Sequence, residues 1–325
     1  MNRVTITILA VLPLIWIGTE STCEAGEEAD GKINYTKLAR SLVRYPNNPV
    51  IKVGERGMWD DQTLGCFTVL DAGEVFHFYS GGAQYGKPKN IGMATSPDGI
   101  QWAKYEKNPL FPGSMPYAIK VGNTFRLYHP GKGGLQMRTS EDGFNWSKPT
   151  RVLAGGIMDP CVVPAGGKFH LYYCGGGRKT KNGKQVWEFK SYMATSEDGI
   201  SWKKEPKPAL PLGPPGSWDE SSHAGPCVLK LEDGFHMWYL GSGTYKDHIA
   251  WRIGHATSPD GLNWTKSGKE PVLDVGKPGD WDCGTFMSFD IIFRDGKFLF
   301  WYAGAPTGHG DETKMTIQIG HGTSK

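Results

Sequence analysis

The sequence predicts an all-β protein, a five-bladed β-propeller in which each blade is a four-stranded antiparallel sheet. One ten-residue stretch occurs four times, and each copy contains a Ser-x-Asp-Gly turn and a Trp three residues after the Gly; the copies are residues 93–102, 137–146, 193–202 and 255–264. An alternating, aromatic-rich stretch that ends in Gly occurs five times. The turns lie roughly 45 to 60 residues apart, which fits propeller blades and is too long for ankyrin or leucine-rich repeats.

Each repeat supplies the same four strands in the same order. The first is a short apolar stretch, at residues 66–70, 117–121, 161–165, 227–231 and 290–293. A turn containing Gly leads to the aromatic strand, at residues 75–82, 124–131, 168–176, 235–243 and 298–304. Alternation with bulky β-formers and flanking Gly is typical of strands. A third strand, the Asp-Gly turn and an outer strand that carries the Trp complete the unit.

The Asp-Gly turns are expected to be architectural. Gly adopts the positive φ of a tight turn, and the Ser and Asp side chains can accept hydrogen bonds from nearby backbone N–H groups. The Trp is expected to pack against the neighbouring blade. A fifth copy begins at residues 320–325 and stops before its turn, so we expect residues 35–43 to complete that blade.

The first 25 residues are expected to be a secretory signal peptide, followed by the propeller domain at residues 26–325. Arg3 precedes an apolar run from Ile6 to Ile17, and small residues follow near Ala25. The run is too short for a membrane span, and the residues before Cys23 disfavour lipidation. We therefore expect a secreted or periplasmic protein with no membrane association after cleavage.

Composition argues against several classes of protein. The net charge is +3 and no block of like charges occurs, so a nucleic-acid partner is not expected. Past residue 25 there are five cysteines without closely spaced pairs, which disfavours a disulfide framework and a zinc ribbon, although one disulfide is compatible with the count. No motif predicts a metal or another cofactor, and we expect a monomer.

The blade motif, with five repeats and an expected signal peptide, resembles the five-bladed propeller glycoside hydrolases, that is, families 43 and 32 and their relatives. The resemblance covers nearly all of residues 26–325. It implies three carboxylates at the mouth of the central channel. An Asp of the first blade is base or nucleophile, the Asp of an Asp-Pro motif orients or tunes, and a Glu of a later blade is the acid.

Only one of these acids is in register. Asp159, in Met158-Asp159-Pro160, matches the Asp-Pro motif, whereas the equivalent positions of the other blades hold Cys66, Met115, Gly225 and Ser288. Nearby loops carry acids a few residues earlier. We therefore expect Asp61 to be base or nucleophile, Asp159 the orienting group and Glu220 the acid. The neighbouring Asp60, Asp219 and Asp282 recur after Trp in three blades and are expected to be structural.

Three further residues break the repeat and are candidates for binding a sugar substrate. They are His129, Arg138 and His223. Asp290, counted as one residue out of phase with Asp159, is expected to face between blades.

The function that the resemblance implies is hydrolysis of an arabinofuranoside, xyloside or fructoside in an oligosaccharide or polysaccharide. The missing acids keep an alternative open, a glycan-binding propeller that has lost catalysis. A fold by itself does not decide between the two.

Overall fold

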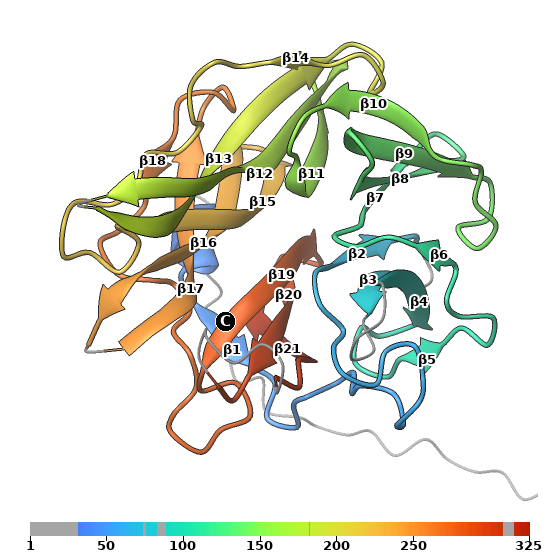
Figure 1. The fold of residues 1–325 in the computed structure, drawn as a ribbon, viewed down its shortest axis with the longest axis horizontal. Helices are drawn as coiled ribbons and strands as arrows, with labels where there is room; N and C mark the ends of the chain where they lie inside the picture. The colour runs from blue at the N-terminus through green and yellow to red at the C-terminus, as the bar shows by residue number, and fades with distance from the viewer. Residues whose placement is uncertain (1–31, 74–75, 83–88, 182, 247, 308–314) are drawn as a thin grey trace, which may run out of the picture.

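The computed structural model describes residues 32–73, 76–82, 89–181, 183–246, 248–307 and 315–325. It confirms the predicted five-bladed β-propeller, with five antiparallel sheets around a central axis (Figure 1). The expected signal peptide lies outside the described residues. Within them, no helix has the length and apolar character needed to cross a membrane.

In the first two blades the strands follow one another in chain order from the inside of the propeller outward. Blade 1 contains β2 (Phe67–Asp71), β3 (Phe76–Gly82), β4 (Asn90–Ser96) and β5 (Ala103–Lys104), and the short β6 (Phe111–Pro112) also pairs with β4. Blade 2 contains β7 (Tyr117–Val121), β8 (Thr124–Gly131), β9 (Gly134–Ser140) and β10 (Thr150–Ala154).

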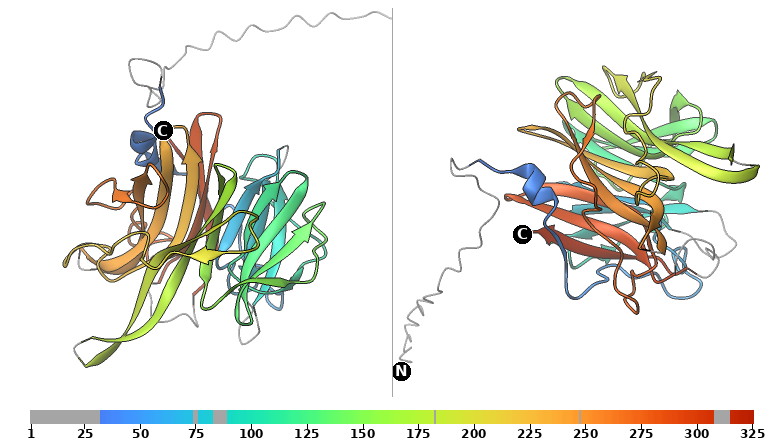
Figure 2. Two further views of the ribbon diagram at one scale, coloured as in Figure 1. Left: turned by 90° about the horizontal axis from the view of Figure 1, so that it is seen from above. Right: turned by 90° about the vertical axis from the view of Figure 1, so that its left-hand side faces the viewer.

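Blades 3 and 4 have longer central hairpins. Blade 3 contains β11 (Met158–Ala165), β12 (Lys168–Lys181), β13 (Lys184–Ser196) and β14 (Lys203–Lys204). Blade 4 contains β15 (Ser222–Leu231), β16 (Gly234–Tyr245), β17 (His248–Ser258) and β18 (Thr265–Lys266). The β12–β13 hairpin extends well beyond the body of the propeller (Figure 2).

Blade 5 is completed by the N-terminal part of the chain. Its strands are β19 (Thr285–Arg294), β20 (Lys297–Ala305), β21 (Gln318–Ser324) and, on the outside, β1 (Leu42–Arg44). The pairing of Leu42 with Ser324 confirms that the segment near residue 43 closes the ring. Residues 35–39, expected to belong to the same strand, instead form a short helix, α1 (Tyr35–Ala39), whose apolar side packs into the core between blades 4 and 5.

The Ser-x-Asp-Gly turns have the expected hydrogen bonds. In the first, Gly99 N donates to Ser96 Oγ at 2.8 Å, and Ile100 N and Gln101 N donate to Asp98 Oδ1 at 2.9 and 2.8 Å. Gly99 has φ +73, which a residue with a side chain would adopt only with strain.

Each turn is also bonded to the preceding blade. The donor is an aromatic side chain of that blade's second strand, and the acceptor is the carbonyl of the turn Gly: Trp301 to Gly99, Tyr79 to Gly143, Tyr128 to Gly199 and Tyr172 to Gly261, at 2.7 to 3.0 Å. The turn tryptophans contact the same aromatic residues, for example Trp146 on Tyr79 at a centroid distance of 5.6 Å. The turns therefore connect neighbouring blades, as expected.

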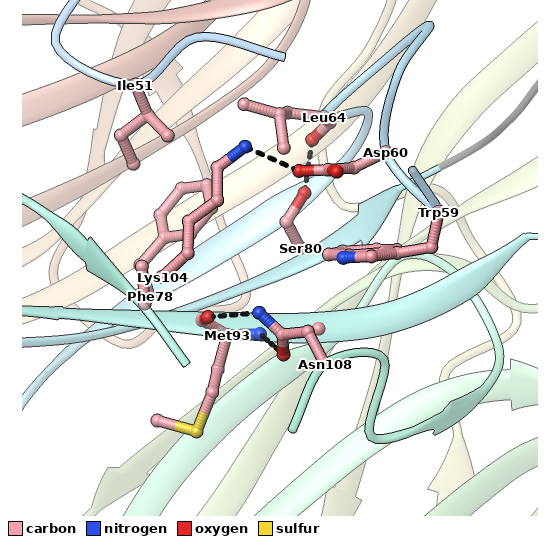
Figure 3. Close-up of a pocket in the computed structure, with 11 residues that line it drawn as sticks. Ile51, Trp59, Asp60, Leu64, Phe78, Ser80, Met93, Lys104 and Asn108 are labelled. Carbon is pink, nitrogen blue, oxygen red and sulfur yellow. Dashed lines mark hydrogen bonds and ion pairs between the residues drawn. The ribbon is translucent and has the colours of Figure 1, made fainter. Parts of the chain in front are cut away.

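A buried ion pair recurs in three blades. Asp60 accepts from Lys104 at 2.7 Å, Asp219 from Lys266 at 2.5 Å and Asp282 from Arg44 at 2.8 Å. Each pair joins the loop before an inner strand to the outer strand of the same blade, as Figure 3 shows for Asp60 and Lys104. These acids therefore have the structural role expected of them.

The tryptophan before each of these acids lies on a pair of glycines. A Cβ atom at Gly82 or Gly92 would stand only 2.1 or 2.3 Å from the Trp59 ring. Trp218 and Trp281 occupy the same position over glycines of blades 4 and 5. The glycines of the second and third strands are thus required by close packing rather than by a turn.

Candidate active site

A pocket of about 240 Å³ lies at the end of the central channel where the inner strands begin. All five blades contribute to it. Its lining comprises Cys66, Met115, Met158, Asp159, Cys174, Phe189, Ala224, Leu240, Trp251, Phe286 and Met287. Phe189 and Trp251 belong to β13 and β17, so the two long hairpins form one wall.

Irregular backbone directs side chains into this pocket. The register of the inner strands shifts between Met158 and Cys161, between Ala224 and Cys227, and between Phe286 and Ser288. Such bulges bend a strand and re-aim its side chains. At the equivalent positions Met115, Asp159 and Gly225 have φ of +52, +45 and +51. Positive φ in a residue other than Gly is uncommon and clusters at functional sites.

Strand pairing confirms which residues are equivalent in the five blades. The aromatic residues of the second strands, Tyr79, Tyr128, Tyr172, Trp238 and Trp301, pair with Thr68, Tyr117, Cys161, Cys227 and Asp290. Two residues earlier stand Cys66, Met115, Asp159, Gly225 and Ser288. Asp159 is therefore the one acid in this ring of five positions.

Asp159 is a half-buried carboxyl in a largely apolar environment. Burial raises the pKa of Asp159, although hydrogen bonds from the Cys66 thiol and the Gly225 N–H, together with the charge of Lys89, favour its ionised form. Burial, together with the Asp159 charge, raises the pKa of the Cys66 thiol well above its usual value. Cys66 therefore acts as a neutral donor to Asp159, and a carboxyl with a raised pKa is suited to giving a proton to a substrate.

Asp290 contacts both neighbouring blades, as expected from the sequence, and it does so at the wall of the channel. It lines a second cavity, of about 30 Å³, together with Cys66 and Asp159. Asp290 pairs with Trp301 as Cys161 pairs with Tyr172, so it is two residues beyond the ring position of Asp159, not one.

The hydrogen bonds of Asp290 indicate a structural role. Its carboxylate accepts from Thr68 Oγ1 and Val69 N at 2.8 Å and from Cys227 Sγ at 3.1 Å. These partners belong to the two neighbouring blades. Asp290 therefore connects blades 4, 5 and 1 at the centre of the ring.

The other two predicted acids do not line the pocket. Asp61 Oδ2 accepts from Gly57 N at 2.7 Å, and Glu220 Oε2 accepts from Gly216 N at 2.7 Å. Asp61 and Glu220 thus occupy the same place in corresponding loops of blades 1 and 4, where each side chain closes its own loop. The structure does not bring them together with Asp159 in one pocket, and their catalytic roles stay predictions.

His223 is buried behind the pocket wall. Its Nε2 lies 3.2 Å from Asp219 Oδ2, which also accepts from Tyr239 and Lys266. The neighbouring residue, Ala224, faces the pocket in its place.

His129 and Arg138 meet each other on the outer side of blades 1 and 2. Arg138 Nε lies 3.4 Å from His129 Nε2, and the guanidinium stands 4.0 Å from the centroid of the Phe111 ring. Arg138 and Phe111 line an open surface pocket of about 310 Å³ that includes none of the channel residues. None of the three residues predicted to bind a sugar, His129, Arg138 and His223, lines the central pocket. Their sugar-binding roles stay predictions.

Sequence reasoning missed the wall residues Phe189, Leu240 and Trp251. The signal that could have identified them is the length of the second and third strands in blades 3 and 4, which continue beyond the glycines where other blades end. The sequence also left one disulfide open. All five cysteines in the described ranges are free thiols, and no cluster of three His, Cys, Asp or Glu residues in those ranges is placed to hold a metal ion.

Comparison with known proteins extends the fold assignment. No protein-family model matches the chain. The uncharacterized proteins MT1551 and Rv1502 of two Mycobacterium tuberculosis strains are 28% and 27% identical over 274 residues, which span 80% of this chain and 73% of each relative.

Solved structures with the same fold include carbohydrate-active enzymes. A glycosyl hydrolase from Bacteroides ovatus superposes with a TM-score of 0.65 at 15% identity, over 86% of this chain and 93% of its own. An N-acetylgalactosamine deacetylase from F. plautii superposes with a TM-score of 0.63 at 18% identity, over 87% and 95%. At these identities the similarity shows the fold, and the expected place in families 43 and 32 stays a prediction.

Proposed function

We propose that the chain is a glycoside hydrolase that admits one terminal sugar residue to the central pocket and uses Asp159 as the proton donor to the glycosidic oxygen. This role replaces the orienting role expected for Asp159 from the sequence, where Glu220 was the expected acid. The observation that carries the proposal is the position of Asp159, a half-buried carboxyl held at φ +45 in the pocket where all five blades meet. The pocket volume is below the roughly 300–1,000 Å³ of sites for drug-sized ligands, which favours a single sugar ring.

Hydrolysis also requires a group that stabilises or attacks the sugar carbon. Two carboxyls flank the bond in most such enzymes. Asp61 and Glu220 stay the sequence-based candidates for this role, because they precede the pocket residues Cys66 and Ala224 by only a few positions. Each would have to leave the Gly N–H from which it accepts a hydrogen bond to reach the pocket. The proposed setting is extracytoplasmic, on the evidence of residues 1–25.

The test is an assay of aryl glycosides with the wild type and two matched variants. Asp159→Asn should lower turnover by about 10²–10⁴-fold, because the amide cannot donate an acidic proton. Asp295→Asn is the control, since Asp295 also has a positive φ, of +52, but is fully exposed at a hairpin turn. Activity that survives in Asp159→Asn would contradict the assignment.

The second candidate is a glycan-binding propeller without catalysis. It is favoured by the absence of a second carboxylate among the described residues that line the pocket. Glycan binding by a wild-type protein that cleaves none of the aryl glycosides would support it.

A further inference from the structure

The lining of the central pocket is unusually poor in groups that can bond a hydroxyl. Apart from Asp159, its side chains are three methionines, two cysteines, and Phe189, Ala224, Leu240, Trp251 and Phe286, among which the Trp251 indole N–H is the one conventional hydrogen-bond donor. The carboxyl of Asp159 is already engaged with the Cys66 thiol and the Gly225 N–H. The described side chains therefore offer few partners to a buried ligand.

This shortage limits which sugar can enter. An unsubstituted pyranose has several hydroxyls, and each one buried without a partner loses its hydrogen bonds to water. One carboxyl can serve at most a few of them. A sugar in which a methyl group replaces a hydroxyl, or caps it as an ether, avoids the loss and gains apolar contact.

The methionines fit such a group. Met115, Met158 and Met287 come from three different blades and face one pocket. Thioether side chains are flexible and polarizable, so they pack well against irregular apolar shapes. Polar residues would be expected at these places if the pocket had to recognise hydroxyls.

We propose that the central pocket selects a terminal sugar bearing a methyl group, that is, a deoxy sugar or a methyl ether. The inference rests on the proposed carbohydrate ligand and does not depend on cleavage. Asp159 would then contact the glycosidic oxygen, while the methyl group lies against the methionines and the wall formed by Leu240 and Trp251.

The test is equilibrium binding of methyl thioglycosides, which resist acid-assisted cleavage, measured by calorimetry with the full chain. Fucose is compared with the galactose of the same absolute configuration, and 3-O-methylglucose with glucose. In at least one pair the fucoside or the 3-O-methylglucoside should bind about tenfold more tightly than its parent sugar, which corresponds to about 1.4 kcal/mol. The pair that responds distinguishes a deoxy sugar from an ether.

Two variants make the test specific. Met287→Gln places an amide in the pocket with little change of volume, and it should reduce the preference at least threefold. Met58→Gln is the matched control, because Met58 is 55% exposed and outside the pocket, and it should leave the preference unchanged.

Three results would overturn the inference. The parent sugars bind as tightly as their methyl-bearing partners in both pairs, none of the four compounds binds, or Met287→Gln leaves the preference unchanged. Cleavage of aryl glycosides without a preference for the methyl-bearing sugar would support the proposed hydrolase and reject the inference. A preference for the methyl-bearing sugar without cleavage would support the inference and reject the hydrolase.

Discussion

At the scale of single residues, Asp159 combines two unfavourable features. Its half-buried carboxyl is desolvated, which raises its pKa, and its backbone has a positive φ. Strain and buried charge of this kind usually persist where function requires them, at some cost in stability. Replacing the acid should therefore separate its contribution to activity from its effect on folding.

We expect Asp159→Asn to stabilise the fold at neutral pH. Burial raises the pKa of Asp159, so at pH values between the unfolded and the folded pKa the folded chain retains a proton that the unfolded chain has lost. Above both pKa values the folded chain bears the cost of a desolvated charge that Asn does not carry. Stability contributed by this group is full below the unfolded pKa of about 3.9 and is lost as the pH rises through the folded pKa. Asn has no charge to bury and tolerates the positive φ.

The melting temperature of Asp159→Asn should exceed that of the wild type at pH 7, by about 1.5 °C per kcal/mol gained. The difference should shrink as the pH is lowered towards 4.5. Asp295→Asn should show no such trend. A variant that melts below the wild type at pH 7 would mean that the carboxylate is stabilised by its partners.

At the scale of elements, the buried ion pairs hold each loop to its outer strand. Burial tends to raise the pKa of Asp219, but hydrogen bonds from His223 and Lys266 outweigh it and hold the pKa well below its usual value. Removing one partner of a buried pair leaves the other charge uncompensated, at a cost of about 3–5 kcal/mol. Asp219→Ala should lose stability by this amount in urea denaturation.

The matched control is Glu197→Ala. The side chains of Glu197 and Lys168 are 76% and 56% exposed, so their pair should contribute at most about 1 kcal/mol. Because the pKa of Asp219 is lowered, its contribution is present above pH 4 and is lost at lower pH. Equal losses in the two variants at pH 7 would show that burial does not set the strength of these pairs.

The aromatic contacts between blades allow a second comparison of elements. Trp301 donates to Gly99 O at 2.7 Å. Trp238 is equivalent in blade 4 and equally buried, but its Nε1 has no hydrogen-bond acceptor in the described part of the chain. In the described part of the chain, the element that packs near Trp238 is α1, whereas a Ser-x-Asp-Gly turn packs on the equivalent aromatic residue of each of the other four blades.

We therefore expect Trp301→Phe to cost about 1 kcal/mol more than Trp238→Phe. Both changes remove similar volume, but only the first removes a hydrogen bond. The excess is modest because Gly99 O also accepts from Trp102 Nε1. Guanidinium unfolding of the two variants measures the difference, and a larger loss for Trp238→Phe would contradict this account.

At the scale of the whole molecule, the repeats made the fold predictable. Patterns that recur in the sequence predict the strand order, the number of blades and the ring of equivalent positions. They also predict the closing segment near residue 43. The candidate site was predictable only at Asp159, where the repeat is broken at a position whose register is clear.

The rest of the site depends on features that alternation does not encode. Asp61 and Glu220 looked unique because one is Asp and the other Glu, yet each accepts from a Gly N–H four residues earlier. The direction of Asp290 depends on strand register near a bulge between Phe286 and Ser288. Phe189 and Trp251 reach the pocket because the paired strands of two hairpins are longer than those described in the other blades.

Closure of the ring by the N-terminal segment leads to the last prediction. Leu38 is 2% exposed and packs with Tyr35 and Leu42 in the core between blades 4 and 5. Lys325 N also donates to Ser41 O, so this segment is bonded to the end of blade 5. Leu38→Ala should cost about 2–5 kcal/mol, as for other large-to-small changes in a core.

The control is Val43→Ala in β1, whose side chain is 42% exposed and which should cost much less. If the ring unfolds as one unit, Leu38→Ala will shift the tryptophan fluorescence and circular dichroism transitions together in urea. A separate early transition in fluorescence alone would mean that the closing segment detaches before the blades unfold. An unchanged midpoint would show that α1 is not part of the cooperative core, and that strand β1 alone completes the propeller.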